Sequence, residues 1–325
     1  MAHNMAVKFL FLPPQTETTR DWAARLSTAG VDAEVVVAET EEDARREIVD
    51  ADAAFGTITP ALLGMAQRLR WLQAPAAAPP AVYYYPELMR HPVVITNFRG
   101  IYNDHIAAHI MAYVLAFARG LHIYLPRQMR QEWSPALESS VVHLPEASAL
   151  IIGVGGIGAE TARLCTAFGM RVLGIDARRA DLPEGVAELY PPAELDRLLP
   201  LADFVIMTVP HTPQTEGMMN AARFKRMQRS AFLINIGRGM TVRLDDLVVA
   251  LRHGEIAGAG LDVYEIEPLP AEHPLWTAPN VLLTPHTAGH GPYLDQRRLE
   301  IILDNMRRFS ADQPLRNVVD KLNWF

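Results

Sequence analysis

The sequence has very little cysteine, because Cys165 is the only one among 325 residues. One thiol cannot form a disulfide within the chain or a cysteine-based metal cluster, so a disulfide-stabilised secreted scaffold is excluded. We therefore expect no metal site and a reducing, cytoplasmic location. Excess positive charge is also lacking, since 30 Lys and Arg stand against 37 Asp and Glu, for a formal net charge of −7. This balance disfavours nucleic acids and anionic membranes as partners.

Uninterrupted apolar runs of membrane-spanning length are missing as well. The first apolar patch is interrupted by Lys8 and ended by Pro13, so we expect a strand there and not a signal peptide. The uncharged stretches at 71–86 and 273–294 contain several prolines and polar side chains, unlike the roughly 20 apolar residues of a membrane helix. We expect no segment that spans a bilayer.

The chain does have the means to bury sizeable cores, with 50% hydrophobic and 21% charged residues. Short β-rich runs alternate with helical patterns, which is typical of α/β architecture with parallel sheets. Between two such sets, residues 104–120 predict a helix that is apolar on nearly every face and therefore buried or at an interface. The predicted strands are 8–12, 34–37, 53–55, 69–72 and 93–96, then 148–152, 170–175, 204–209, 231–236, 259–263 and 281–284, with early helices near 18–28 and 41–49.

The most informative motif is a glycine-rich turn between a predicted strand and a predicted helix. After SALII at 148–152 come Gly153, Gly155 and Gly158 in G-x-G-x-x-G spacing, and a second strand then ends in Asp176. The first glycine allows a tight turn, the second lets the backbone approach a pyrophosphate, and the third lets helix and strand pack closely. The helix N-terminus adds free N–H groups and a partial positive charge. This ordered set predicts a dinucleotide site.

Asp176 also bears on which dinucleotide is bound. A carboxylate at this position can accept hydrogen bonds from both adenosine ribose hydroxyls and repels a 2′-phosphate, which favours NAD. Arg178 and Arg179 follow it, and two arginines could attract a 2′-phosphate. We predict NAD, with NADP as the alternative.

Arg238, Glu267 and His286 each follow a predicted strand of the second set. In a doubly wound sheet the C-terminal strand ends share one edge, where ligands bind. Arginine offers two parallel donors to a carboxylate, and a histidine can exchange a proton near neutral pH. A carboxylate on the far ring nitrogen would fix the tautomer and favour the protonated ring. The set predicts hydride transfer between a nicotinamide cofactor and C2 of a 2-oxo or 2-hydroxy acid.

These residues resemble the D-isomer-specific 2-hydroxyacid dehydrogenases, with similarity to both the glyoxylate/hydroxypyruvate reductases and the phosphoglycerate dehydrogenases. GVGGIG at 153–158 resembles the family's cofactor fingerprint, INIGRGM at 234–240 its arginine motif, GLDVYEIEPLP at 260–270 its glutamate motif and LLTPHTAG at 282–289 its histidine motif. The resemblance implies that Arg238 binds the substrate, Glu267 tunes the histidine and His286 is the acid/base. It places cofactor contacts at Gly153, Gly155, Gly156, Ile157, Gly158, Asp176, Val209, Ile236, Gly237 and Asp262.

The resemblance also implies a discontinuous domain arrangement. Residues 1–100 with 291–325 are expected to form a smaller, flavodoxin-like substrate-binding domain, and 101–290 a doubly wound Rossmann domain for the dinucleotide. The family is usually a homodimer formed through its cofactor domain. The apolar segment Ile106–Phe117 and the arm up to Leu144 are the expected interface, and Trp133 stands where relatives place an aromatic residue that can reach the partner's site.

The substrate, a small 2-oxo or 2-hydroxy acid, is expected to bind backbone amides of the loop after WLQ at 71–73. Pro79 and Pro80 lack N–H groups, so only the amides of residues 76–78 can donate there. Ala77 and Ala78, together with Arg238, are the predicted contacts. This loop departs from the family's usual Ala-Gly or Gly-Val.

A second departure is Ala108, where the family often carries Glu. The histidine that follows it, His109, is as compatible with a structural role as with a functional one. Three alternatives differ in class. A formate dehydrogenase would pair its histidine with Gln, an NAD(H)-sensing, corepressor-like binding protein of the same fold would show little turnover, and a short-chain reductase needs a Tyr-x-x-x-Lys pair that the sequence lacks after Gly158. Glyoxylate, hydroxypyruvate and bulkier 2-oxo acids all remain open as substrates.

Overall fold

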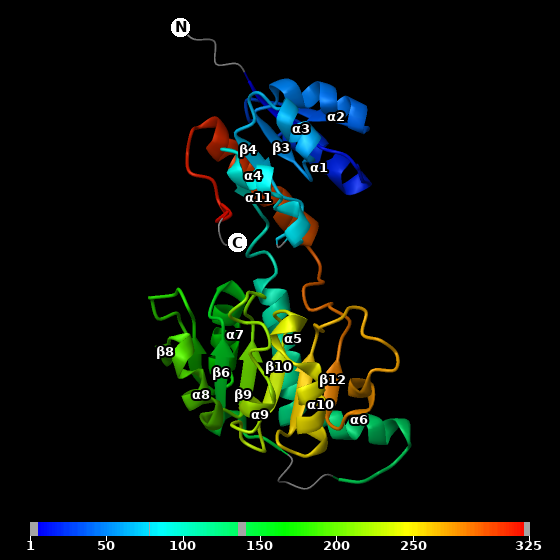
Figure 1. The fold of residues 1–325 in the computed structure, drawn as a ribbon, viewed down its shortest axis with the longest axis vertical. Coiled ribbons are helices and arrows are strands. Elements are labelled where there is room, and N and C mark those ends of the chain that lie inside the picture. The colour runs from blue at the N-terminus through cyan, green and yellow to red at the C-terminus, as the bar shows by residue number, and fades with distance from the viewer. Residues whose placement is uncertain (1–5, 78, 136–140, 322–325) are drawn as a thin grey trace. The chain divides into compact units, whose positions relative to one another are not determined.

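The computed structural model describes residues 6–77, 79–135 and 141–321. The chain divides into two compact units, Met1–Ile101 with Pro292–Phe325, and Tyr102–Gly291 (Figure 1). In the first unit the strands are β1 (Val7–Phe11), β2 (Ala33–Val37), β3 (Ala53–Phe55), β4 (Trp71–Gln73) and β5 (Val94–Thr96), and the helices are α1 (Glu17–Ser27), α2 (Glu41–Glu47), α3 (Pro60–Met65), α4 (Pro86–Arg90) and α11 (Leu294–Ser310).

In the second unit the strands are β6 (Ser148–Ile152), β7 (Arg171–Ile175), β8 (Glu188–Tyr190), β9 (Phe204–Met207), β10 (Phe232–Asn235), β11 (Gly258–Leu261) and β12 (Val281–Leu283). Its helices are α5 (Asn103–Ala118), α6 (Leu121–Met129), α7 (Gly156–Ala167), α8 (Leu195–Leu198), α9 (Ala221–Phe224) and α10 (Leu244–Arg252). The unit boundaries fall one residue from those expected from the sequence, and the binding roles assigned to the two units remain predictions.

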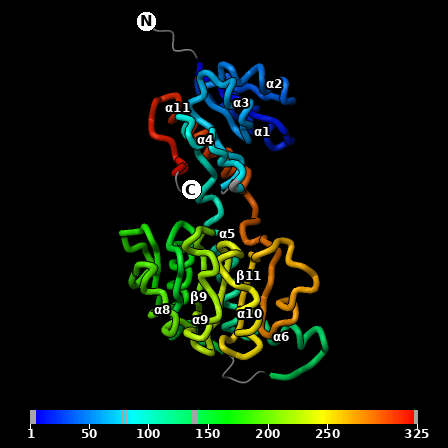
Figure 2. The backbone as a smooth tube through the Cα atoms, viewed as in Figure 1, coloured from blue at the N-terminus to red at the C-terminus, as the bar shows by residue number. Residues whose placement is uncertain are grey.

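The first unit is built on a parallel sheet that runs in the order β2-β1-β3-β4-β5 within the described residues. This is the flavodoxin-like strand order. The C-terminal segment completes the unit, as Figure 2 shows by the red chain beside the blue and cyan one. The ring of Phe309 in α11 packs 5.6 Å from that of Trp71, and the amide of Asn317 donates to the carbonyls of Asn97 and Arg99.

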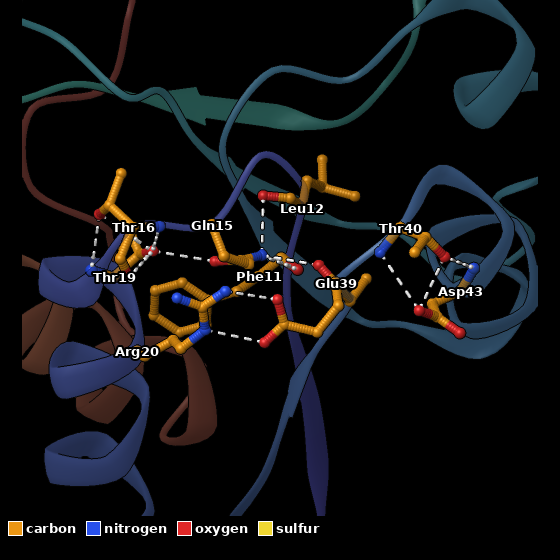
Figure 3. A network of polar contacts seen from close by, with 10 residues as sticks. Phe11, Leu12, Gln15, Thr16, Thr19, Arg20, Glu39, Thr40 and Asp43 are labelled. Carbon is orange, nitrogen blue, oxygen red and sulfur yellow. Dashed lines mark hydrogen bonds and ion pairs between the residues drawn. The ribbon is translucent and has the colours of Figure 1, made fainter.

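Polar side chains close the edge of this sheet where β1 and β2 end (Figure 3). The amide nitrogen of Gln15 donates to the carbonyls of Phe11, Leu12 and Ala38, so one side chain ties the two strand ends together. Thr16 caps α1 beside it in a reciprocal capping box, and Thr40 with Asp43 does the same for α2. Each box satisfies N–H groups that would otherwise lack a partner at a helix start.

The second unit has a parallel sheet in the order β12-β11-β10-β9-β6-β7-β8 within the described residues. The order reverses at β6, whose neighbours are β7 on one side and β9 on the other. A doubly wound sheet binds ligands at the carboxyl edge of such a switch point. The prediction of a second parallel α/β sheet is therefore confirmed, and its switch point lies at the glycine-rich turn.

Alternate residues of each strand in this sheet enter two different cores, as period-2 side chains must. Leu150 and Ile152 of β6 pack with α8, α9 and α10 on one face, whereas Ala149 and Ile151 pack with α5 and α7 on the other. Cys165 of α7 is in the second core, where burial raises the pKa of its thiol to about 12. The expected burial of helix 104–120 is confirmed by α5, whose Ile110, Val114 and Phe117 are fully enclosed.

Within the described residues, no single helix combines the length and apolarity needed to cross a membrane. Helices α5 and α6 pass that test only as a pair, and they are bent by 75° relative to one another.

Candidate active site

The glycine-rich turn has the geometry of a dinucleotide cradle. Gly153 has a φ of 94°, and its amide donates to the carbonyl of Ile175 at 2.8 Å. A Cβ added to Gly158 would lie 2.1 Å from the Gly153 carbonyl oxygen, so only glycine permits this helix–strand contact. Gly155 is exposed, and an added Cβ there would meet no described atom within 4 Å. This is the open approach that a pyrophosphate needs, so the turn fits the predicted cofactor.

Helix α7 starts directly at this turn. Gly155 is its N-cap and Ile157 lies half-buried in its first turn, so the first N–H groups of a twelve-residue helix face the open side of the loop. Gly156 lies against the side chain of Asn103, at the start of α5, whose nitrogen would be 2.5 Å from an added Cβ. Sequence reasoning did not single out Asn103, because nothing in the sequence links the start of α5 to the fingerprint.

Asp176 lies just after β7, as predicted, and its carboxylate organises the turn around it. One oxygen accepts the amide of Val154 at 2.8 Å, and the other accepts the amides of Arg178 and Arg179 at 2.8 and 2.9 Å. A carboxylate offers about four acceptor sites, so this set leaves room for a further donor such as a ribose hydroxyl.

The guanidinium of Arg179 is held beside Asp176 by two partners. It donates to the carbonyl of Val154 at 2.8 Å and forms an ion pair with Asp181 at 2.9 Å. An open depression of about 610 Å³ is lined by residues 176–180, Leu182 and residues 188–191. This depression lies at the strand end where the adenosine of a dinucleotide is expected.

His286 and Glu267 form the predicted pair. Nδ1 of His286 lies 2.7 Å from one oxygen of Glu267, and the other oxygen of Glu267 accepts the amide of Tyr264 at 3.0 Å. The side chains are 51% and 36% exposed, so the pair is open to solvent and to a ligand. Because Nδ1 faces the carboxylate, Nε2 is the ring nitrogen left for proton exchange.

Arg238 follows β10 on the same edge of the sheet as this pair. Its side chain is exposed and donates to the Gly237 carbonyl at 2.7 Å. Although the residue is exposed, protein atoms surround its guanidinium and partly desolvate it, which lowers the pKa of Arg238, and the charge of Glu267 opposes this shift. An arginine remains charged under such a shift, so the site holds a permanent cation near the pair.

Gly239 explains how the arginine turn and the glutamate turn approach each other. An added Cβ at Gly239 would lie 1.8 Å from the backbone carbonyl of Tyr264, so these two turns are in direct backbone contact. This residue is in the arginine motif but was not predicted as important. The signal available in the sequence is a glycine directly after the predicted substrate-binding arginine.

The remaining predicted cofactor positions lie at the same strand ends. Val209 follows β9, and Ile236 and Gly237 follow β10. An added Cβ at Gly237 would lie 2.5 Å from the Val209 carbonyl oxygen, so the two loops are packed together next to the glycine-rich turn. The structure thus brings together the predicted residues after β6, β7, β9 and β10.

Asp262 is 1% exposed, and its carboxylate is occupied by the protein itself. It accepts the hydroxyl of Thr284 at 2.5 Å and the amides of Thr287 and Ala288 at 2.8 and 2.9 Å. Its backbone carbonyl accepts the amide of His286 at 2.9 Å. Besides its predicted cofactor contact, Asp262 therefore anchors the loop that carries the predicted acid/base.

The predicted substrate loop lies in the first unit. Ala76 and Ala77 are half-buried, and among the described residues their amides have no hydrogen-bond partner, as donors for a carboxylate would require. Ala78 lies outside the described residues. Tyr83 and Tyr85, which follow the loop, donate to the carbonyls of Gly56 and Ile58.

No group of three or more His, Cys, Asp or Glu side chains in the described part of the chain is placed to hold a metal ion.

Comparison with known proteins gives the same identity as the motifs. Residues 111–288 match the family model of the NAD-binding domain of the D-isomer-specific 2-hydroxyacid dehydrogenases. The chain is 34% identical over 240 residues to a glyoxylate reductase of Korarchaeum cryptofilum. The aligned segment covers 72% of this chain and 71% of that protein.

Solved structures agree over nearly the full length. A D-isomer-specific 2-hydroxyacid dehydrogenase from Xanthobacter autotrophicus, in complex with NADPH and MES, has a TM-score of 0.82 at 27% identity and covers 98% of this chain and 100% of its own. An NADPH-dependent glyoxylate/hydroxypyruvate reductase from Sinorhizobium meliloti, in complex with NADP and sulfate, has a TM-score of 0.79 at 27% identity with the same coverage. The chain therefore belongs to the D-isomer-specific 2-hydroxyacid dehydrogenases, a family of NAD(P)-dependent oxidoreductases.

Proposed function

We propose that the protein interconverts a small 2-oxo acid, such as glyoxylate or hydroxypyruvate, and the corresponding D-2-hydroxy acid. The observation that carries the proposal is the His286–Glu267 hydrogen bond at one edge of the sheet with Arg238 and the glycine-rich turn. An anionic substrate needs a cation, and reduction of its carbonyl needs a proton donor, and this edge has both.

Each residue has a defined role in this reaction. The nicotinamide cofactor supplies or accepts the hydride when it is bound. Arg238 binds the carboxylate and polarises the carbonyl, and His286 gives its Nε2 proton to the oxygen at C2 in reduction and takes it back in oxidation. Glu267 holds the ring through Nδ1 and so points Nε2 at the substrate. The amides of Ala76, Ala77 and Ala78 are the proposed donors to the substrate from the first unit.

We further propose that NADH is preferred over NADPH. Asp176 keeps an acceptor site for the ribose and repels a 2′-phosphate, and Arg179 would have to leave Val154 and Asp181 before it could bind that phosphate. The further cofactor contacts that we propose are the residues that follow three strands, together with Asp262. They are Gly153, Gly155, Gly156, Ile157 and Gly158 after β6, Val209 after β9, and Ile236 and Gly237 after β10.

A cytoplasmic homodimer is the proposed working form. Helix α6 has no buried residue among those described, and Leu121, Leu125 and Met129 are 44%, 51% and 84% exposed. Trp133 continues this spacing and is fully exposed. Half of the residues of the segment Ile106–Phe117, which the sequence places at the interface, are buried inside their own unit. The proposed interface is therefore centred on the next part of that region, the apolar stripe of α6 with Trp133.

The test is a spectrophotometric assay of NADH and NADPH oxidation with glyoxylate, hydroxypyruvate, pyruvate and phenylpyruvate. We expect turnover with at least one small acid, and faster turnover at limiting cofactor with NADH. Tight NADH binding without turnover of any acid would contradict the proposal and favour the NAD(H)-sensing, corepressor-like alternative.

A further inference from the structure

A chain of hydrogen bonds leads from helix α5 to the loop that carries His286. Nε2 of His109 lies 3.0 Å from the Thr284 hydroxyl oxygen, which donates to Asp262 at 2.5 Å. Asp262 then accepts the amides of the two residues that follow His286, Thr287 and Ala288. All of these residues belong to the same unit, so the path does not depend on how the two units are placed.

The direction of each bond follows from counting hydrogens. Thr284 has one hydroxyl hydrogen, and it goes to the carboxylate of Asp262. The Thr284 oxygen therefore accepts from His109 and, at 2.6 Å, from the hydroxyl of Tyr113. The single hydrogen of that hydroxyl also has the Leu261 carbonyl within reach, at 3.0 Å. His109 consequently carries a hydrogen on Nε2.

The surroundings of His109 fix its ring in this arrangement. The ring lies edge-on to that of Tyr113, with centroids 4.9 Å apart and an interplanar angle of 88°. Burial lowers the pKa of His109 and so favours the neutral ring, although the charge of Asp262 acts in the opposite direction. Tyr113 is 5% exposed and His109 is half-buried, so both neighbours of the Thr284 oxygen are held by packing.

His286 needs such support because its backbone is in an unfavourable region. Its φ is 53°, the left-handed conformation that residues with side chains rarely adopt. The amide of His286 donates to the backbone carbonyl of Asp262, while the Asp262 carboxylate holds the next two amides. A loosened Asp262 would therefore release the loop on both sides of the strained residue.

We propose that His109 is a positioning residue: together with Tyr113 it fixes the Thr284 hydroxyl on Asp262, and so keeps the His286 loop in the conformation that pairs His286 with Glu267. The proposal rests on the proposed role of His286 in the reaction. It assigns a function to a histidine for which the sequence leaves a structural and a functional role equally open.

Three variants and a control test this role. His109→Leu removes the donor, and His109→Gln restores an N–H near the position of Nε2. Tyr113→Phe removes the hydroxyl, with its contacts to Thr284 and to the Leu261 carbonyl, and keeps the ring. His122→Leu is the matched control, because His122 is a second half-buried histidine of this unit, packed edge-on to Phe117 and Phe232.

The first readout is amide hydrogen exchange at Thr287 and Ala288 in the protein without substrate or cofactor. We expect about five- to tenfold faster exchange of these two amides in His109→Leu and Tyr113→Phe, the effect of losing one buried hydrogen bond. His109→Gln and His122→Leu are expected to exchange like the unchanged protein. This readout needs no turnover, so it stands apart from the test of the proposed function.

The second readout is a split between kcat and KM. His109→Leu is expected to lower kcat about five- to tenfold with the KM for NADH unchanged, and His109→Gln to recover most of it. Unchanged exchange at both amides in His109→Leu and Tyr113→Phe would overturn the proposal, whatever the activity. Equal losses in His109→Leu and His122→Leu would also overturn it, since they would indicate a general packing defect.

Discussion

Among single residues, the proposed chemistry depends most on the 2.7 Å contact between His286 and Glu267. We expect His286→Ala to lower kcat by about 10²- to 10⁴-fold, because that is the usual contribution of a positioned proton donor. NADH affinity should change little, since the proposed role of the ring lies in the chemical step. Steady-state kinetics and fluorescence titration with NADH measure the two quantities.

The matched control is His290→Ala, which removes another exposed histidine four residues further along the same loop. It should retain both turnover and NADH affinity. Full activity of His286→Ala would remove this residue from the mechanism and leave the proposed acid/base unassigned.

Asp176 allows a second prediction for a single residue. Asp176→Ala removes the ribose acceptor and the charge that repels a 2′-phosphate, so the Kd for NADH should rise by about tenfold or more and that for NADPH by less. Isothermal titration of both cofactors measures the difference. Asp181→Ala is the control for the neighbouring ion pair, and an equal rise for the two cofactors in Asp176→Ala would show that this carboxylate does not select NADH.

Among the secondary-structure elements, the contact between the turns after β10 and β11 is the one most sensitive to added volume. A methyl group on Gly239 would lie 1.8 Å from the Tyr264 carbonyl, so Gly239→Ala must push the two turns apart. We expect a loss of about 1–3 kcal/mol in the free energy of unfolding, as for other overpacked sites, together with lower kcat because Arg238 and Glu267 move apart.

Chemical denaturation and the standard assay measure these two effects. Gly64→Ala is the matched control, because Gly64 lies in helix α3 and an added Cβ there meets no described atom within 4 Å. The control should be as stable as the unchanged protein or more so, since alanine is favoured over glycine in a helix. An unchanged stability of Gly239→Ala would mean that the two turns adapt without cost.

The elements also show what the sequence could and could not predict. Central strands such as β6 are short apolar runs between clear boundaries, and Ser148–Ile152 was predicted residue for residue. The strand predicted at 204–209 ends at Met207, and the side chain of the next residue, Thr208, donates to the Gly153 carbonyl. β8 has only three residues and lies at the sheet edge, so it has no apolar run to reveal it.

Helix α10 was not predicted, although five of its nine residues are buried and its apolar positions repeat with helical spacing. That signal was available in the sequence. The hydrogen-bond partners of Asp262 and His109 could not be predicted from the sequence. They depend on where α5 meets the end of β12, which only the packed structure determines.

At the scale of the whole molecule, the four motifs predicted the strand ends at one sheet edge, because parallel topology forces them together. The sequence indicated that the region of α6 belongs to an interface, but it did not show which of its side chains are exposed. The apolar segment that begins at residue 106 lies in helix α5. The buried side chains of α5 pack within their own unit, where α7 is a close neighbour. Periodicity alone could not separate a helix buried within one chain from a helix covered by a second copy.

The stripe leads to a prediction about assembly. Light scattering should give about twice the chain mass of 36.1 kDa if the stripe of α6 and Trp133 is covered by the same stripe of a second copy. The double variant Leu125→Asp with Met129→Asp introduces charges at the proposed contact and should give the mass of one chain. Leu201→Asp is the matched control, since Leu201 is exposed to the same 51% as Leu125 but lies outside α6. A monomer in the unchanged protein would contradict the proposed dimer, and a dimer that persists in the double variant would place the interface on another surface.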